Sequence, residues 1–291
     1  MTLLNTASDG FFNVLIVLHR TLAIHGPMDE DRLIRLCSPG PDHDATRLRQ
    51  TLLRWTQLGL FKTTANDKLT LDKADKDPER LPATCRRLLF SDPNNQGFWD
   101  NEGTRAADFS RALAFILAQD IYTNEFGAHA QVQALEQRQV RNEARRILQN
   151  DVRWNGLRFW GDYLGFFWVD QRRWPDPTAA IREELPEVFG EQNELPAQVF
   201  ITRLGERLPV LDGGRYRLEI EAALEPAEWQ PPNPQRLLST SLSRALWRLS
   251  RAGGPLRLPD ARSDAGDGRT LQRAGGRQWQ TFTHVQLAQG V

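Results

Sequence analysis

Apolar positions near the start of the chain recur three or four residues apart, the period of an α-helix that buries one face. The first such stretch follows Asp9-Gly10 and ends at His25-Gly26-Pro27. A second, shorter stretch begins after Asp29 and stops at Ser38-Pro39-Gly40. A third begins at Asp44, and its apolar face consists of Leu48, Leu52, Trp55 and Leu58. The pattern therefore predicts three helices in succession.

A β-hairpin is predicted directly after these helices. Gly59 follows the third helix and suits the left-handed conformation that ends many helices. Two short segments with apolar residues then flank Ala65-Asn66-Asp67, an order typical of two strands joined by a turn. Three short helices followed by a hairpin are typical of a winged-helix unit, to which we assign residues 1–75.

The end of this predicted unit recurs twice along the chain. In each copy an apolar helical face starts eleven residues before a glycine, from 48 to 59, from 154 to 165 and from 242 to 253, and a short apolar segment follows. Internal repeats of this kind indicate repeated structural units. We expect tandem winged-helix units in a mainly α fold with small β-hairpins, an α+β protein.

Breaks in composition divide the chain after the first unit. The expected parts are a turn-rich linker at 76–103, a helical segment with a second winged-helix-like unit at 104–175, an acidic segment at 176–230, and a basic C-terminal part with a candidate third unit at 231–291. We further expect helices at Phe109–Tyr122 and Ala130–Leu148, two helices and a hairpin-like Leu208–Ile220 within the acidic segment, and a mobile loop at Gly266–Gly276.

Charge is unevenly distributed although Lys+Arg and Asp+Glu number 37 each. Residues 1–72 are neutral, 135–175 carry three excess positive charges, 176–230 hold five basic and twelve acidic residues, and 231–291 hold nine basic and three acidic residues. Such blocks either form surfaces for different partners or face each other inside one molecule.

In a DNA-binding winged helix, the third helix enters the major groove and the hairpin touches phosphate. The basic residues that could do so are Arg47, Arg49, Arg54, Lys62 and Lys68 in the first unit, Arg145, Arg146, Arg153 and Arg158 around the second, and Arg244, Arg248 and Arg251 on the third. A plain solvated helix face would look the same. The aromatic group from Trp154 to Trp174, which includes Trp160 and Trp168, is expected to be mostly core rather than a base-stacking surface.

Signatures of catalysis are missing from the sequence. It contains no Walker loop, no Gly-x-Gly-x-x-Gly, no His-Glu-x-x-His and no Gly-x-Ser-x-Gly, and its five histidines show no metal-ligand spacing. We expect no enzyme activity, cofactor or metal, although a nuclease could use carboxylates far apart in sequence. The two cysteines, the absence of a signal peptide and of a long apolar run predict a cytoplasmic protein without a membrane span.

Three stretches carry a family resemblance: LLNTASDGFFNVLIVLHRTL, then RWNGLRFWGDYLGFFWVD with Pro175-Asp176-Pro177, and LPVLDGGRYR. Together they resemble DpdG, a component of bacterial gene clusters that install 7-deazaguanine bases in DNA and restrict DNA lacking them. The resemblance implies a role in modification-linked restriction or phage defence, and it supplies no functional residues.

The sequence thus predicts a non-enzymatic, multi-winged-helix protein. Its expected partners are DNA, chiefly double-stranded, and other proteins of a modification or defence complex. A protein-only adaptor that uses its winged helices for docking, and a transcriptional regulator, are the alternatives.

Overall fold

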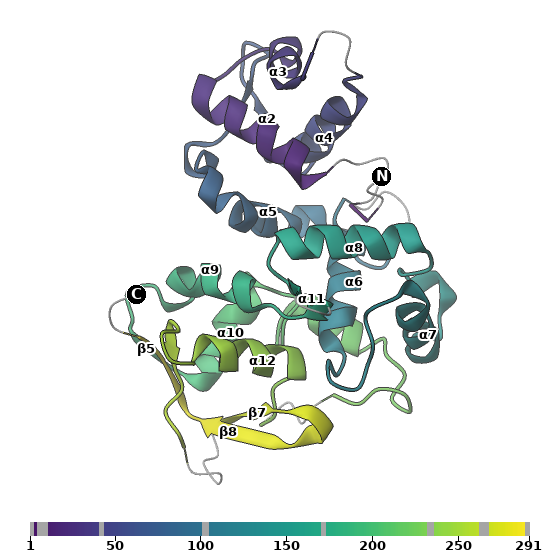
Figure 1. The fold of residues 1–291 in the computed structure, drawn as a ribbon, viewed down its shortest axis with the longest axis vertical. Helices are drawn as coiled ribbons and strands as arrows, with labels where there is room; N and C mark the ends of the chain where they lie inside the picture. Colours follow the sequence, from purple (N-terminus) through teal and green to yellow (C-terminus); the bar gives the residue numbers. More distant parts are fainter. Residues whose placement is uncertain are drawn as a thin grey trace. The chain divides into compact units, whose positions relative to one another are not determined.

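The computed structural model describes residues 3–4, 11–40, 44–100, 105–169, 173–231, 236–261 and 268–288 (Figure 1). The chain divides into two compact units: unit 1 comprises residues 1–109 and 152–163, and unit 2 comprises residues 110–151 and 164–291. With 52% helix and 11% strand in small antiparallel sheets, the expected mainly α, α+β class is confirmed. The assignment of winged-helix units stays a prediction.

Unit 1 begins with the three expected helices and the hairpin. The elements are α2 (Phe12–His25), α3 (Glu30–Cys37), α4 (Thr46–Gln57), β1 (Lys62–Thr63), β2 (Leu69–Thr70), α5 (Leu81–Leu89) and α8 (Asp151–Tyr163). Strands β1 and β2 pair antiparallel, and Met28, between α2 and α3, forms a further bridge to Leu69. The predicted helix entry at Asp9-Gly10 lies outside the described residues.

The core of unit 1 is aromatic. Trp55 of α4 is fully buried, and its ring centroid lies 5.4 Å from that of Trp160 on α8. Phe12 of α2 stacks on Phe159 at 4.5 Å and on Tyr163 at 4.6 Å. The predicted apolar face of α4 is buried as a set, at Leu48, Leu52, Trp55 and Leu58. Packing of large rings therefore holds α8 in unit 1 with the N-terminal helices.

The three glycines of the sequence repeat share one backbone conformation. Gly59, Gly165 and Gly253 have φ of 94°, 80° and 79°, in the left-handed region that ends helices. After Gly165 comes the hairpin of β3 (Phe167–Val169) and β4 (Arg173–Pro175). After Gly253, by contrast, β6 (Leu256–Arg257) pairs with the distant β9 (His284–Leu287), so the third copy has no local hairpin.

Among the described residues, unit 2 stacks helices beside three small sheets. Its helices are α6 (Ala107–Ala118), which starts in unit 1, α7 (His129–Gln139), α9 (Thr178–Phe189), α10 (Ala197–Arg207), α11 (Arg215–Glu221) and α12 (Thr240–Leu249). The sheets are the β3–β4 pair, a sheet in which β9 lies between β5 (Glu194–Pro196) and β6, and the pair of β7 (Arg269–Gln272) and β8 (Gln278–Phe282). Helix α12 packs on α9 and on β7, as Figure 1 shows within this unit.

Three expected elements are wrong. Residues 208–220 form no hairpin, because Gly213, with φ 74°, turns the chain into helix α11. The helix expected to reach Leu148 ends at Gln139, because the buried Glu136 carboxylate accepts the backbone N–H groups of Ile147 and Leu148 and folds this segment back. Residues 269–276 form β7 and a 3-10 turn instead of a loop, while 266–267 lie outside the described residues.

Candidate nucleic-acid interface

Two of the five basic side chains predicted on α4 and the hairpin of unit 1, Arg49 and Lys62, pair with carboxylates. Arg49 donates to Glu30 at 2.6 Å and to Asp31 at 3.0 Å, and these hydrogen bonds raise its pKa. Lys62 pairs with Asp72 at 2.5 Å. Lys68 is exposed in the turn between β1 and β2. The Arg47 guanidinium lies 5.3 Å from the centroid of the Phe11 ring. This surface therefore carries less free positive charge than its sequence indicates.

Arg54 requires a correction. The sequence predicts that Arg54 could contact DNA, but its side chain is only 2% exposed and cannot reach phosphate in this conformation. Helix α4 buries a second stripe, at Thr51 and Arg54, beside the apolar one. The helical spacing of apolar residues predicts only the apolar stripe, because an arginine in a helix is usually exposed.

The structure divides the basic residues predicted around the second winged-helix-like unit between unit 1 and unit 2. Arg153 and Arg158 lie on α8 in unit 1, and the Arg158 guanidinium lies 5.8 Å from the centroid of the Trp154 ring. Arg145 and Arg146 belong to unit 2: Arg145 ends the 3-10 turn that follows α7, and Arg146 comes directly after it. Arg146 donates to the carbonyls of Val140 and Arg141 and to Glu143. These four residues do not share one helix face.

Of the three arginines predicted on the third unit, the two that lie on α12 hold a buried carboxylate. Arg244 Nε and Arg248 Nη1 donate to Asp176 Oδ2 at 3.1 and 2.7 Å. The Asp176 side chain is fully buried, whereas the two arginines keep 22% and 21% of their surface exposed. Its other oxygen accepts the Thr178 backbone N–H at 3.0 Å and so starts α9. Arg244 and Arg248 consequently stabilise unit 2, with one positive charge more than Asp176 neutralises.

The third arginine, Arg251, lies just beyond the end of α12 and belongs to a row of alternating guanidinium and indole groups. Arg251 lies 4.6 Å from the Trp247 ring centroid, Trp247 lies 4.6 Å from Trp279, and Arg273 lies 3.6 Å from Trp279. Both arginines are exposed and both indoles are half-buried. We call Arg251, Trp247, Trp279 and Arg273 the Arg–Trp ladder.

Two elements bring the ladder together. Trp247 lies on α12 and Trp279 on β8, and α12 packs on β7, the partner strand of β8. A related pair lies elsewhere on α12, where the Arg248 guanidinium is 3.8 Å from the Trp168 ring. The aromatic group is predicted to be mostly core; Trp154 and Trp160 are buried, whereas Trp168 is 42% exposed. Sequence spacing could not reveal the ladder, because its members come from separate elements.

Other chemistry is sparse in the part of the chain that the structure describes. No group of three His, Cys, Asp or Glu residues there could hold a metal ion. Burial raises the pKa of the Cys85 thiol, which opposes formation of a thiolate. Among the described helices, none combines the length and apolar character needed to cross a membrane.

These features define a mainly helical protein of two units with an exposed arginine–tryptophan surface on unit 2. The family model of DpdG-like proteins matches residues 1–265, and the chain therefore belongs to the DpdG-like family. The match includes α12 and ends before β7. Neither the curated proteins nor the solved structures contain a match to the chain.

Proposed function

We propose that this protein is a non-enzymatic nucleic-acid-binding component of a DNA-modification-linked restriction or phage-defence complex. The Arg–Trp ladder carries the proposal. Guanidinium groups bind phosphate oxygens, and indole faces stack on bases. Membership of the DpdG-like family supports the DNA-modification context.

The ladder favours single-stranded segments over intact duplex. Indole stacking requires a base whose face is free, and paired bases are covered by their neighbours. Arg251 and Arg273 stand at the two ends of the Trp247–Trp279 pair, so phosphates that flank a stacked base could reach them. We further propose that α4 and β1–β2 of unit 1 form a winged helix that contacts duplex DNA weakly, since carboxylates face Arg49 and Lys62.

Fluorescence anisotropy with a labelled single-stranded oligonucleotide and its duplex tests this proposal. We expect Arg251→Ala with Arg273→Ala to weaken single-strand binding at low salt by about tenfold, the loss for about 1.4 kcal/mol. The matched control, Arg32→Ala with Arg182→Ala, removes equal charge from exposed positions outside the ladder and should change binding less than about threefold. Equal losses in both variants, or no binding by the wild type, would overturn the proposal.

A protein-only adaptor is the second candidate, and one observation in unit 1 favours it. Val17 of α2, Leu36 of α3 and Leu53 of α4 are large apolar side chains that are 44%, 49% and 48% exposed. Val17 also lines a cavity of about 270 Å³ with Val14 and Leu48. Co-purification with the other proteins of a DNA-modification gene cluster that contains this chain's gene tests this role. A Val17→Asp variant should lose the partner, while Arg251→Ala with Arg273→Ala should retain it.

A further inference from the structure

The helices and strands at residues 178–287 of unit 2 follow the order of those at residues 12–70 of unit 1. Helix α9 packs on both α10 and α12, as α2 packs on both α3 and α4. Strand β5, which precedes the second of these helices, pairs antiparallel with the last strand, β9, as Met28 bridges to Leu69 of β2. Strand β6, which follows the third helix, also pairs with β9, as β1 pairs with β2. This order is typical of a winged helix, with α11 added between the second and third helices.

The wing, which is the segment between the last two strands of such a fold, is larger in unit 2. Residues 64–68 join β1 to β2, whereas residues 258–283 join β6 to β9 and contain the β7–β8 hairpin. Strand β7 packs on α12 (Figure 1), and the Gln272 backbone N–H donates to Ser243 Oγ at 2.9 Å. The enlarged wing is therefore fixed beside the third helix.

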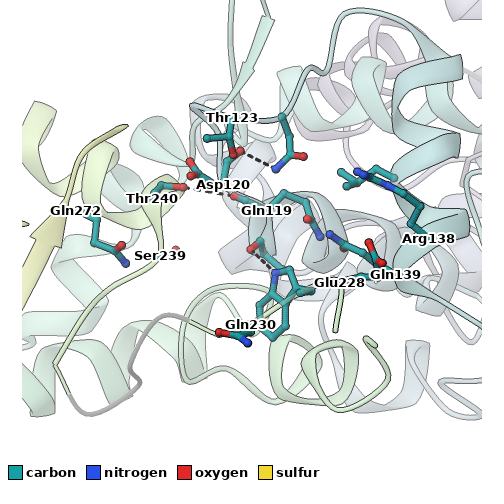
Figure 2. A pocket seen from close by; sticks show the side chains of 14 residues that line it. Gln119, Asp120, Thr123, Arg138, Gln139, Glu228, Gln230, Ser239, Thr240 and Gln272 are labelled. Carbon is teal, nitrogen blue, oxygen red and sulfur yellow. Dashed lines mark hydrogen bonds between the residues drawn. The ribbon is translucent and has the colours of Figure 1, made fainter. Parts of the chain in front are cut away.

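The start of α12 is fixed as well. The Ile121 backbone N–H donates to Thr240 Oγ1 at 3.0 Å, and Ser241 Oγ donates to the Leu117 carbonyl at 2.7 Å. Figure 2 shows Thr240 and Gln272 on one side of a pocket of about 370 Å³, where the start of α12 lies close to β7. Because hydrogen bonds hold α12 to the end of α6 and to the wing, its outer face is a preformed surface.

Two neighbouring stripes of side chains run along the outer face of α12. Arg244 and Arg248, four residues apart, form one stripe, and Trp247 and Arg251 form the other. The first stripe pairs with Asp176, which neutralises one of its two charges. The second stripe belongs to the Arg–Trp ladder and faces the wing. A residual positive charge and the ladder thus lie side by side.

The corresponding face of α4 lacks these groups. Aligning the two copies of the repeat at their glycines places Gln50, Leu53 and Gln57 of α4 where the third copy carries arginine, tryptophan and arginine. Neutral side chains bind phosphate less strongly than guanidinium groups do, and leucine offers no ring on which a base could stack. The side chains of the third copy, rather than the shared order of elements, therefore suit it to nucleic acid.

We propose that α12 and the enlarged wing bind a DNA junction, at which a duplex continues into a single strand. This inference rests on the proposed function of the Arg–Trp ladder and names its substrate. The third helix and the wing of a winged helix contact the phosphates of duplex DNA, and the residual charge of the Arg244–Arg248 stripe favours this contact. The ladder beside it needs an unpaired base, because neighbouring pairs cover the faces of bases in a duplex. A junction serves both stripes at once.

Fluorescence anisotropy with the full chain and three labelled DNAs tests this substrate class. The DNAs are a single strand, its blunt duplex, and the same duplex with an unpaired extension of about six nucleotides at the 3′ or the 5′ end. We expect an extended duplex to bind at least about tenfold more tightly than either other DNA, because both contacts then act within one molecule. An extended duplex that binds no better than the tighter of the other two overturns the junction. If the single strand still binds, the ladder proposal stands, whereas binding of no DNA overturns both proposals.

Substitutions in the wing then locate the unpaired strand. Trp279→Ala should bring the affinity for the extended duplex down to that for the blunt duplex, and should change the latter less than about twofold, because the indole stacks only on unpaired bases. Trp279→Phe, which keeps an aromatic face, should retain most of the preference. Leu53→Ala, at the α4 position that corresponds to Trp247, is the control and should change neither affinity.

The two substitutions at Trp279 also separate stacking from a role in the fold. An equal loss on both duplexes in Trp279→Ala and Trp279→Phe would mean that this side chain serves the fold or paired DNA, and would overturn the proposal. An unchanged preference for the extended duplex in Trp279→Ala would overturn it too.

Discussion

At the scale of single residues, Asp176 joins two parts of unit 2 through charge. Its buried carboxylate accepts hydrogen bonds from Arg244 and Arg248, and it also starts helix α9. Asp176→Asn keeps an oxygen for the Thr178 N–H and removes only the charge. We expect the free energy of unfolding to fall by about 3 kcal/mol, because two partly buried guanidinium groups lose their counter-charge.

Urea unfolding measures this loss, and Asp72→Asn provides the comparison. Asp72 and its partner Lys62 are each about half exposed, so that pair contributes less than about 1 kcal/mol. If both variants lost the same stability, Asp176 would be no more than a surface ion-pair partner.

His19 makes the stability of unit 1 depend on pH. Its Nε2 donates to the Asp75 carbonyl at 2.6 Å, and its buried Nδ1 has no hydrogen-bond partner among the described residues, so protonation would place a poorly solvated charge inside the unit. Burial lowers the pKa of His19 below its ordinary value of 6.5, despite the raising effect of the Asp75 carbonyl. The unfolded chain then binds the proton first, so stability is complete above pH 6.5 and falls as the pH decreases toward the folded-state pKa.

Denaturant midpoints measured between neutral and mildly acid pH check this expectation. His19→Gln should be less stable at neutral pH and should lose most of the decline on acidification. His25→Gln, at an exposed position on the same helix, should keep the wild-type profile. A wild-type profile that is flat through this range would contradict the assignment of a neutral, buried imidazole.

At the scale of elements, the glycines that end helices in the second and third copies of the repeat, Gly165 and Gly253, have different surroundings. Gly165 and Gly253 have nearly equal positive φ, but a Cβ on Gly165 would lie 2.7 Å from the Ala180 backbone nitrogen, whereas a Cβ on Gly253 would meet nothing within 4 Å. Gly253→Ala should cost about 1–2 kcal/mol, the strain of a left-handed alanine. Gly165→Ala should cost clearly more, since the backbones of β3 and α9 must also separate.

Thermal unfolding of the two alanine variants makes the comparison under identical conditions. Equal losses would mean that α9 can shift away at little cost. The close approach would then contribute nothing beyond the turn conformation.

Helical periodicity and glycine stops predicted the local elements of unit 1 well. The face from Leu48 to Leu58 and the stop at Gly59 follow from periodicity and residue type, although Trp55 of that face also packs on the distant Trp160. The failure at residues 140–148 has a different origin, since a carboxylate on α7 captures two backbone N–H groups and no periodic pattern records such a bond. Arg54 is buried although arginine is usually exposed, and Trp168 is exposed although tryptophan is usually mostly buried. Tertiary packing, which periodicity does not describe, decides both cases.

At the scale of the whole molecule, the opposing charge blocks interact within unit 2. Asp176 of the acidic segment pairs with Arg244 and Arg248 of the basic C-terminal part. Asp212 of the same segment accepts the N–H and the hydroxyl of Ser239, a neutral residue of that part. Part of the charge segregation is therefore internal. Arg251 and Arg273 instead lie over indole rings at the surface.

Because Arg251 and Arg273 are not held by buried carboxylates among the described residues, we predict how DNA affinity depends on salt concentration. Salt weakens phosphate contacts and affects base stacking much less. Each phosphate contact on a single strand changes the slope of log affinity against log salt by about 0.7. Arg251→Ala with Arg273→Ala should therefore flatten the slope by about 1.4. Trp247→Ala and Trp279→Ala should weaken binding by about 1–3 kcal/mol per stacked base and leave the slope unchanged, because an indole carries no charge.

Anisotropy titrations of single-stranded DNA at several salt concentrations distinguish these effects on one surface. A change of slope in the arginine variant with full affinity in both tryptophan variants would mean that the ladder contacts only phosphates, and the preference for unpaired bases would be wrong. Unchanged slope and affinity in all variants would remove nucleic acid from this face of unit 2. The exposed apolar residues of unit 1 would then make protein docking the better account of the molecule.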